Sequence, residues 1–194
     1  MTERRILIDQ EKIREAMVSI IDAIGEDSER EGLVDTPKRV AQMYGEFFSG
    51  LAEDPSKVLS IGFEEEVGDG EMVILKDIPF SSICEHHFLP FHGSASIGYV
   101  PSGRVVGASK LARALDILAH RPQMQERLTS QFADTIFGAI EPDGVAVVLR
   151  AEHMCMSLRG VKKPGAKIVT TASRGIISTR DATRRDFYSL LSQA

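Results

Sequence analysis

The sequence contains two cysteines, and both have histidines close by. Cys84 is followed by His86 and His87, and His153 lies two residues before Cys155. Three of the five histidines therefore gather beside the two cysteines. A disulfide is not needed for stability, because a chain of 194 residues can bury a sufficient core without one. The clustering indicates metal binding or catalysis.

The spacing of these residues predicts a zinc site. A turn can bring Cys84 and His87 to one ion, and Cys155 supplies a third ligand from far along the chain. Thiolates with imidazole favour zinc over magnesium or calcium. Three protein ligands leave a position for water, as in catalytic sites, whereas a fourth ligand from His86 or His153 would make the site structural. Structural sites usually carry more cysteines. An unrelated pair of core thiols would leave the neighbouring histidines without a role.

Two thiolates cancel the charge of Zn²⁺, so the ion activates water less strongly than one held by three neutral imidazoles. Groups that transfer protons beside the metal would then assist the reaction. His86 and His153 are the candidates for this work.

A second group of residues could bind an anion. Ser109 and Lys110 open an expected helix, whose free N–H groups attract phosphate. Arg113 follows Lys110 by three residues, so both can point to one side. Arg159 comes soon after Cys155. In an acidic protein these cations suggest an anionic small substrate, although a solvated helix face is an equally good interpretation.

Gln125 and Glu126 lie in the first turn of a further expected helix. A carboxylate there is stabilised by the helix dipole, which is a sufficient structural reason for it. It would also suit the adjacent N–H donors on the edge of a guanine. The sequence leaves both interpretations open.

The elements that position these residues can be predicted from periodicity. Helical spacing of apolar residues indicates a helix over residues 13–24, ending at Gly25. A second helix is expected to open at Asp35-Thr36-Pro37, with a capping side chain and Pro37 at the first helical position.

The rest of the chain mixes strands and helices. Strands are expected over residues 72–78, 93–100, 145–155 and 167–172, and helices from near Ser109, from Pro122 and from about Arg180. Alternation along the third strand would place His153 and Cys155 on the same face. This order predicts an α+β domain with an antiparallel sheet, to which the N-terminal helices are an appendage.

Composition excludes several classes of protein. The net charge is −5 and the pI about 5.6, whereas nucleic-acid binders usually carry a basic excess. No apolar run reaches the length of a membrane span, and the first residues do not form a signal peptide. We therefore expect a cytoplasmic protein with neither nucleic-acid nor membrane partners.

The motifs together resemble GTP cyclohydrolase I. The resembling segments are Cys84–Gly93, Ile97–Pro101, Ser109–Arg113, Gln123–Thr129 and His153–Val161. They follow one another in the family's order, and the resemblance runs from about Asp35 to the C-terminus.

The resemblance implies the tunnelling fold (T-fold), an α+β fold with an antiparallel sheet backed by helices. It implies one domain over residues 1–194, with an N-terminal helical extension to about residue 60 and a catalytic core from about residue 61. Subunits would join their sheets into a barrel, and two five-membered rings would stack into a homodecamer. The implied reaction converts GTP and water into 7,8-dihydroneopterin triphosphate and formate, the first step of tetrahydrofolate and pterin biosynthesis.

The resemblance also implies a role for each metal and proton-transfer residue. Cys84, His87 and Cys155 would bind one zinc ion per subunit, which activates water for addition to C8 of guanine. His153 would donate a proton at N7, and His86 would assist ring opening and formate release.

The remaining roles concern substrate binding. Ser109 would contact the ribose during the sugar rearrangement, and Glu126 with Gln125 would hold the guanine. The triphosphate would be held by Lys110, Arg113 and Arg159, joined by Arg39 from a neighbouring subunit.

Two alternatives remain. Another pterin enzyme of the same fold would hold zinc with three histidines or use a catalytic cysteine without the Cys84–His87 pairing. A zinc-stabilised nucleotide-binding module would have a four-coordinate metal and no turnover.

Overall fold

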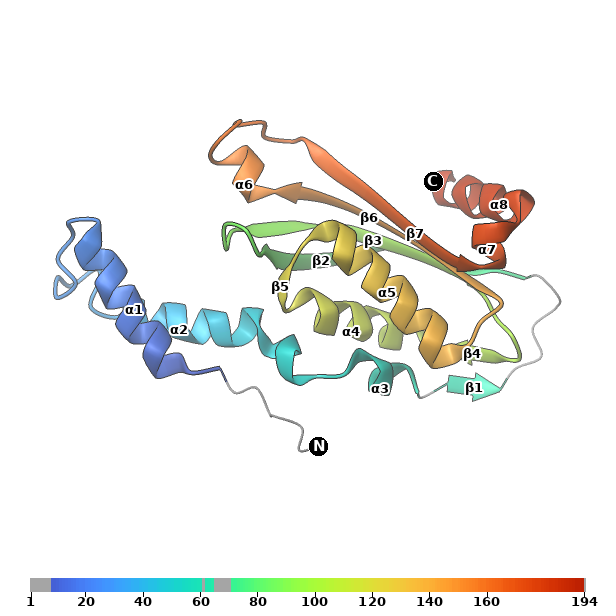
Figure 1. Ribbon diagram of the computed structural model, residues 1–194, viewed down its shortest axis with the longest axis horizontal. Coiled ribbons are helices and arrows are strands. Elements are labelled where there is room, and N and C mark those ends of the chain that lie inside the picture. Colours follow the sequence, from blue (N-terminus) through green and yellow to red (C-terminus); the bar gives the residue numbers. More distant parts are fainter. Residues whose placement is uncertain (1–7, 61, 65–70, 194) are drawn as a thin grey trace.

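The computed structural model describes residues 8–60, 62–64 and 71–193 (Figure 1). The helices are α1 (Gln10–Ala23), α2 (Thr36–Phe47), the 3-10 helix η1 (Ser49–Ala52), α3 (Pro55–Leu59), α4 (Ala108–Ala119), α5 (Gln125–Ile140), α6 (Met154–Ser157), α7 (Ile176–Thr179) and α8 (Asp181–Ser192). The strands are β1 (Gly62–Glu64), β2 (Val73–Cys84), β3 (Pro90–Val100), β4 (Arg104–Val106), β5 (Pro122–Gln123), β6 (Gly144–His153) and β7 (Lys167–Gly175). Within the described residues, no helix is long and apolar enough to cross a membrane.

The predicted N-terminal helices are present, but the expected cap of the second one is wrong. Asp35 has a helical backbone (φ −90°, ψ −10°), and its side chain makes no capping hydrogen bond. An N-cap side chain reaches back to the first N–H groups when its own backbone is extended. The Asp35 carboxylate instead extends along the helix to Arg39, 3.3 Å away.

The five-stranded sheet has the order β5-β2-β3-β6-β7 and provides the frame of the molecule. All its neighbouring strands are antiparallel except β5, which pairs in parallel with β2 at Ile83 and Cys84. The antiparallel sheet and the strands predicted for it are confirmed.

Each face of the sheet is covered by helices, as the alternation along β6 demonstrates. Val145, Val147 and Leu149 are buried in the core cluster that contains the apolar faces of α4 and α5. Ala146 and Val148, which point the other way, are buried with residues of α7 and α8. Figure 1 shows α4 and α5 side by side across one face of the sheet, and α1 and α2 extending beyond its end.

Two predicted boundaries are wrong beside the site. Pro122 does not start a helix, because Pro122 and Gln123 pair with the end of β2 and α5 begins only at Gln125. The strand β6 does not continue to Cys155 but ends at His153, opposite Phe91. The next partner position on β3 would be Pro90, which has no N–H to donate to the ladder. Cys155 therefore lies in the short helix α6 rather than on one strand face with His153.

Candidate metal and substrate site

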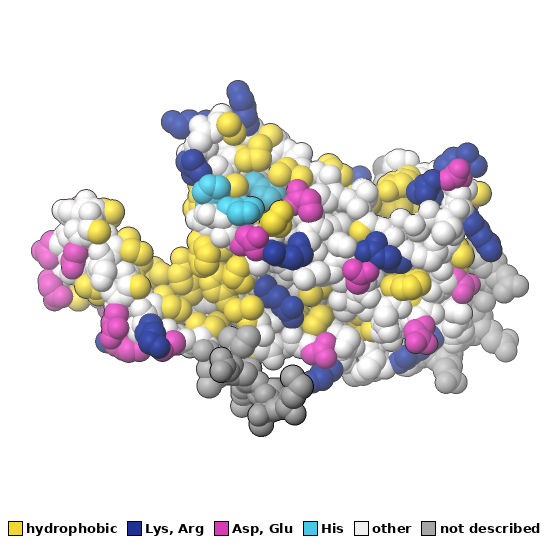
Figure 2. Space-filling view, in the orientation of Figure 1, with side chains coloured by type: hydrophobic (Ala, Val, Ile, Leu, Met, Phe, Trp, Pro, Cys, Tyr) yellow, Lys and Arg dark blue, Asp and Glu magenta, His cyan; other side chains and the backbone are white. Residues whose placement is uncertain are grey.

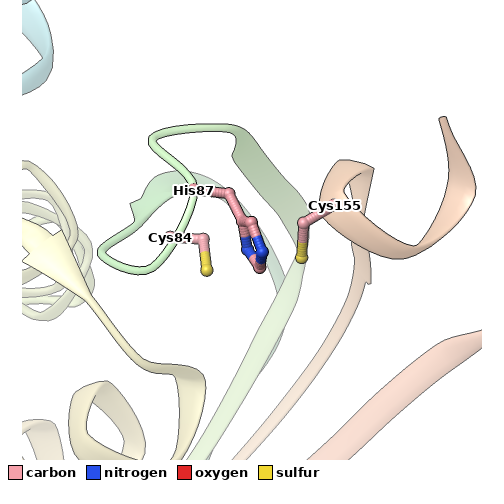
Figure 3. Close-up of side chains that lie close together, drawn as sticks. All are labelled: Cys84, His87 and Cys155. Atoms are coloured by element: carbon pink, nitrogen blue, oxygen red, sulfur yellow. The ribbon is translucent and has the colours of Figure 1, made fainter. Parts of the chain in front are cut away.

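Two cysteines and a histidine converge where β2, the following turn and α6 meet. Cys84 is the last residue of β2, His87 lies in the turn before β3, and Cys155 lies in the first turn of α6. Their ligand atoms all lie within 4.8 Å of one another (Figure 3). Cys84 is buried, Cys155 is half-buried and His87 is exposed, so an ion held here would be accessible from solvent. This group could bind a metal ion.

The turn that carries His87 is fixed from two sides. The Cys84 N–H donates to the Leu89 carbonyl, and the Phe88 N–H donates to the Cys84 carbonyl, both at 2.9 Å. The Glu85 N–H donates to the carbonyl of Gln123 at 3.0 Å, which ties the turn to the residues before α5.

Phe88 anchors the same turn against the N-terminal helices. Its backbone is left-handed (φ +52°), and its ring packs edge-on against Tyr44 and Phe48, with ring centroids 6.3 and 5.7 Å away. Sequence spacing does not predict this contact, because Phe88 lies in a turn 40 residues beyond Phe48, whereas Tyr44 and Phe48 both lie at the end of α2.

The protonation of the Cys155 thiol depends on its surroundings. Burial raises the pKa of Cys155, and the neighbouring Cys84 thiol raises it further, whereas the charge of Arg159 lowers it. Arg159 lies two residues beyond the end of α6, the helix that carries Cys155. A bound cation would favour the thiolate form of both sulfur atoms.

His86 lies beside the metal group without belonging to it. Its Nδ1 is 3.8 Å from the Cys84 sulfur, and its Nε2 is 3.9 Å from the Glu85 carboxylate. Glu85 forms an ion pair with Arg127 on α5, and the Nε of Arg127 donates to Gln123 at 3.1 Å. Arg127 was not predicted as a site residue, although it lies within the resembling segment Gln123–Thr129.

His153 is held inside the protein at the end of β6. Its ring stacks on Phe91 with a centroid distance of 4.5 Å and an interplanar angle of 5°. Its Nε2 lies 2.8 Å from the side-chain oxygen of Gln125. Burial lowers the pKa of His153, and the charge of Glu126 opposes this shift. Glu126 is exposed beside it, whereas Gln125 is only 1% exposed.

The expected phosphate-binding group of α4 lies elsewhere in the same chain. Ser109, Lys110 and Arg113 are at the start of α4, directly after β4, whereas the end of α4 leads to β5 beside Cys84. Twelve helical residues extend about 18 Å. Figure 1 shows the two ends of α4 at β4 and near β5. One chain therefore does not bring this group to its own metal site.

The predicted site residues thus divide into two sets. The structure brings together the metal group, His86, His153 and Gln125, and it places Glu126 next to Gln125 in the chain and Arg159 just after α6. Figure 2 shows histidine side chains gathered on one part of the surface, beside acidic and basic ones. Arg39 is exposed on α2 and contacts Asp35.

Comparisons with known proteins identify the family of this chain. The profile of the family described as GTP cyclohydrolase I matches residues 13–192. The protein named GTP cyclohydrolase 1 from Dehalococcoides mccartyi (strain 195) is 54% identical over 189 residues, covering 96% of this chain and 99% of that protein. The protein of the same name from Pelotomaculum thermopropionicum is 58% identical over 186 residues, covering 95% and 98%. That of Streptococcus mutans is 52% identical over 188 residues, covering 96% and 97%.

These matches extend over nearly the whole chain, including every segment that forms the metal group. The antiparallel sheet backed by helices is the tunnelling fold expected from the sequence. The chain is an enzyme and belongs to the GTP cyclohydrolase I family.

Proposed function

We propose that this protein converts GTP and water into 7,8-dihydroneopterin triphosphate and formate, the first step of tetrahydrofolate and pterin biosynthesis. The observation that carries the proposal is a cluster of three donor atoms flanked by two histidines that do not belong to it. It occurs in a chain more than half identical to proteins named GTP cyclohydrolase 1. The cytoplasmic location expected from the sequence stays a prediction.

The metal that suits these donors is zinc. Two sulfurs and one imidazole nitrogen form a soft donor set that magnesium and calcium do not favour. Three protein ligands are the number found in catalytic zinc sites, which keep a position open for water or substrate. When bound, zinc would supply Lewis acidity for the addition of water to the guanine ring.

Some side chains around the metal group would then transfer protons, and others would bind the guanine base. We assign proton donation at N7 of guanine to His153, and ring opening with formate release to His86. Glu126 would accept from the N–H groups of the guanine edge, because it is exposed and follows Gln125, whose side chain contacts His153. Arg159 would contact the triphosphate, since it follows closely after α6, which carries Cys155.

The other triphosphate contacts require a second copy of the chain. Ser109, which would contact the ribose, and the cations Lys110 and Arg113 lie at the far end of α4 from the metal group of their own chain. We therefore propose that a neighbouring subunit supplies them, and that Arg39 reaches the triphosphate in the same way.

The edges of the sheet offer a way to join the copies. Within the described residues, β7 pairs only with β6, and the first ten residues of β2, 73–82, have no partner on their outer side. Unpaired edges are templates for pairing with another chain. Pairing β2 of one copy with β7 of the next is a head-to-tail contact, which closes a ring when the rotation is suitable. A decamer of two such five-membered rings is the assembly that the family resemblance suggests.

One assay tests the reaction. The zinc-loaded protein is incubated with GTP, and formate release is measured together with the fluorescence of oxidised neopterin. We expect both products in equal amounts. A folded, zinc-loaded sample that releases no formate would refute the proposal, and formate without the pterin would indicate a different reaction. Light scattering on the same sample measures the mass of the assembly.

A further inference from the structure

The side-chain amide of Gln125 can adopt only one orientation. Its nitrogen lies 3.2 Å from the Leu149 carbonyl oxygen and 3.1 Å from the Ile168 carbonyl oxygen. Carbonyl oxygens only accept hydrogen bonds, so the atom facing them must be the NH₂ group. The amide oxygen therefore points to His153.

The hydroxyl groups around Gln125 support the same orientation. Thr129 donates to the backbone carbonyl of Gln125 at 2.7 Å, so the 2.6 Å contact between Thr129 and Thr170 takes its proton from Thr170. The Thr170 oxygen has then used its proton and accepts from the Gln125 NH₂ at 3.0 Å. Every donor in this chain of contacts has an acceptor, and turning the amide would place its oxygen against two carbonyls.

The orientation of Gln125 determines which nitrogen of His153 carries a proton. The amide oxygen is only an acceptor, so the 2.8 Å contact requires a hydrogen on Nε2 of His153. In the neutral ring Nδ1 is then unprotonated.

The two ring nitrogens of His153 differ in their contacts. Within the described residues, every fully buried side-chain nitrogen or oxygen has a hydrogen-bond partner, whereas Nδ1 of His153 has none. Nδ1 is therefore not fully buried. Stacking on Phe91 fixes the plane of the ring.

We propose that Gln125 is a positioning residue that holds His153 as the Nε2–H tautomer, so that Nδ1 is the nitrogen that takes up the proton which His153 then donates at N7 of guanine. The sequence led us to expect that Gln125 contacts the guanine. Gln125 is poorly placed for that contact, because it is only 1% exposed and its side chain is fully hydrogen-bonded. The part that concerns the substrate rests on the proposed function, whereas the tautomer does not.

The tautomer can be measured without turnover. Solid-state nitrogen-15 spectra of the zinc-loaded protein with labelled histidine are recorded well above the ordinary pKa of histidine, where neutral rings show distinct protonated and unprotonated nitrogens. The His153 signal is the one lost in His153→Gln. We expect a protonated Nε2 and an unprotonated Nδ1, unchanged in Thr170→Val, which keeps both carbonyl acceptors. A protonated Nδ1 with an unprotonated Nε2 would overturn the proposal.

Kinetics separate positioning from substrate contact. Gln125→Met keeps the length of the side chain but removes both polar atoms. We expect kcat for formate release to fall by at least about 10-fold, because general acid–base catalysis typically contributes 10²–10⁴-fold, with KM for GTP and zinc content nearly unchanged. A raised KM with unchanged kcat would make Gln125 a substrate contact and overturn its positioning role. If the wild-type protein releases no formate, the proposed function fails, while the spectra still decide the tautomer.

Discussion

Gly93 gives the sharpest test of how closely the strands approach beside the site. It lies in β3, opposite Ala151 of β6. A Cβ atom added at Gly93 would lie 1.8 Å from the Arg150 carbonyl oxygen and 2.7 Å from the Ala151 Cα. Both are backbone atoms, so no side-chain rotation can relieve the clash. Gly93→Ala therefore forces β3 and β6 apart.

The size of the effect follows from these distances. Real Cβ contacts are essentially never shorter than 3.0 Å, so the oxygen must move by at least 3.0 − 1.8 = 1.2 Å. Overpacking of this kind costs about 1–3 kcal/mol, and weakening two ladder hydrogen bonds adds about 0.5–1.5 kcal/mol each. We expect a loss of roughly 3 kcal/mol, which lowers the unfolding temperature by about 6–12 °C in a chain of this length.

Gly138→Ala is the matched control. Gly138 lies inside α5, and an added Cβ would meet no atom within 4 Å. Alanine there should stabilise the helix by about 0.5–1 kcal/mol. Calorimetry of both zinc-loaded variants beside the wild type measures the two shifts, which should have opposite signs. Since β3 and β6 carry Phe91 and His153, Gly93→Ala should also slow formate release. An unchanged unfolding temperature for Gly93→Ala would refute the described approach of the strands.

Three further predictions concern the site itself. Cys155→Ser should abolish zinc binding and formate release while the circular dichroism of the fold is retained; full zinc content would show that Cys155 is not a ligand. Glu126→Ala should raise KM for GTP roughly tenfold or more, since a hydrogen bond to a charged group contributes about 1.5–3 kcal/mol; unchanged kinetics with normal zinc would exclude it from the guanine site. Lys110→Ala should be nearly inactive alone, but its co-production with Cys155→Ser should restore about a quarter of the wild-type activity in randomly mixed oligomers. No restoration above the parents would argue that each chain uses its own Lys110.

The sequence determined most of the elements and the metal group. Periodicity predicted the two N-terminal helices and the antiparallel strands, because apolar spacing follows directly from which face is buried. Cys84 and His87 could be paired from sequence because two intervening residues allow a turn to bring them together. Cys155 could be added as the third ligand because it too has a histidine close by, and the family resemblance gave Glu126 and Arg159 their expected roles.

Only the tertiary structure decided how distant segments meet. The end of β6 at His153 depends on Pro90 of another strand, so the position of Cys155 in α6 could not be derived from local alternation. The contact of Gln125 with His153 joins residues 28 positions apart, and the first turn of a helix gives no sign of it. The separation of the α4 cations from the metal group likewise follows from the direction in which α4 crosses the sheet. Sequence spacing fixes local geometry over a few residues, whereas the partner of a buried polar group depends on which elements pack against it.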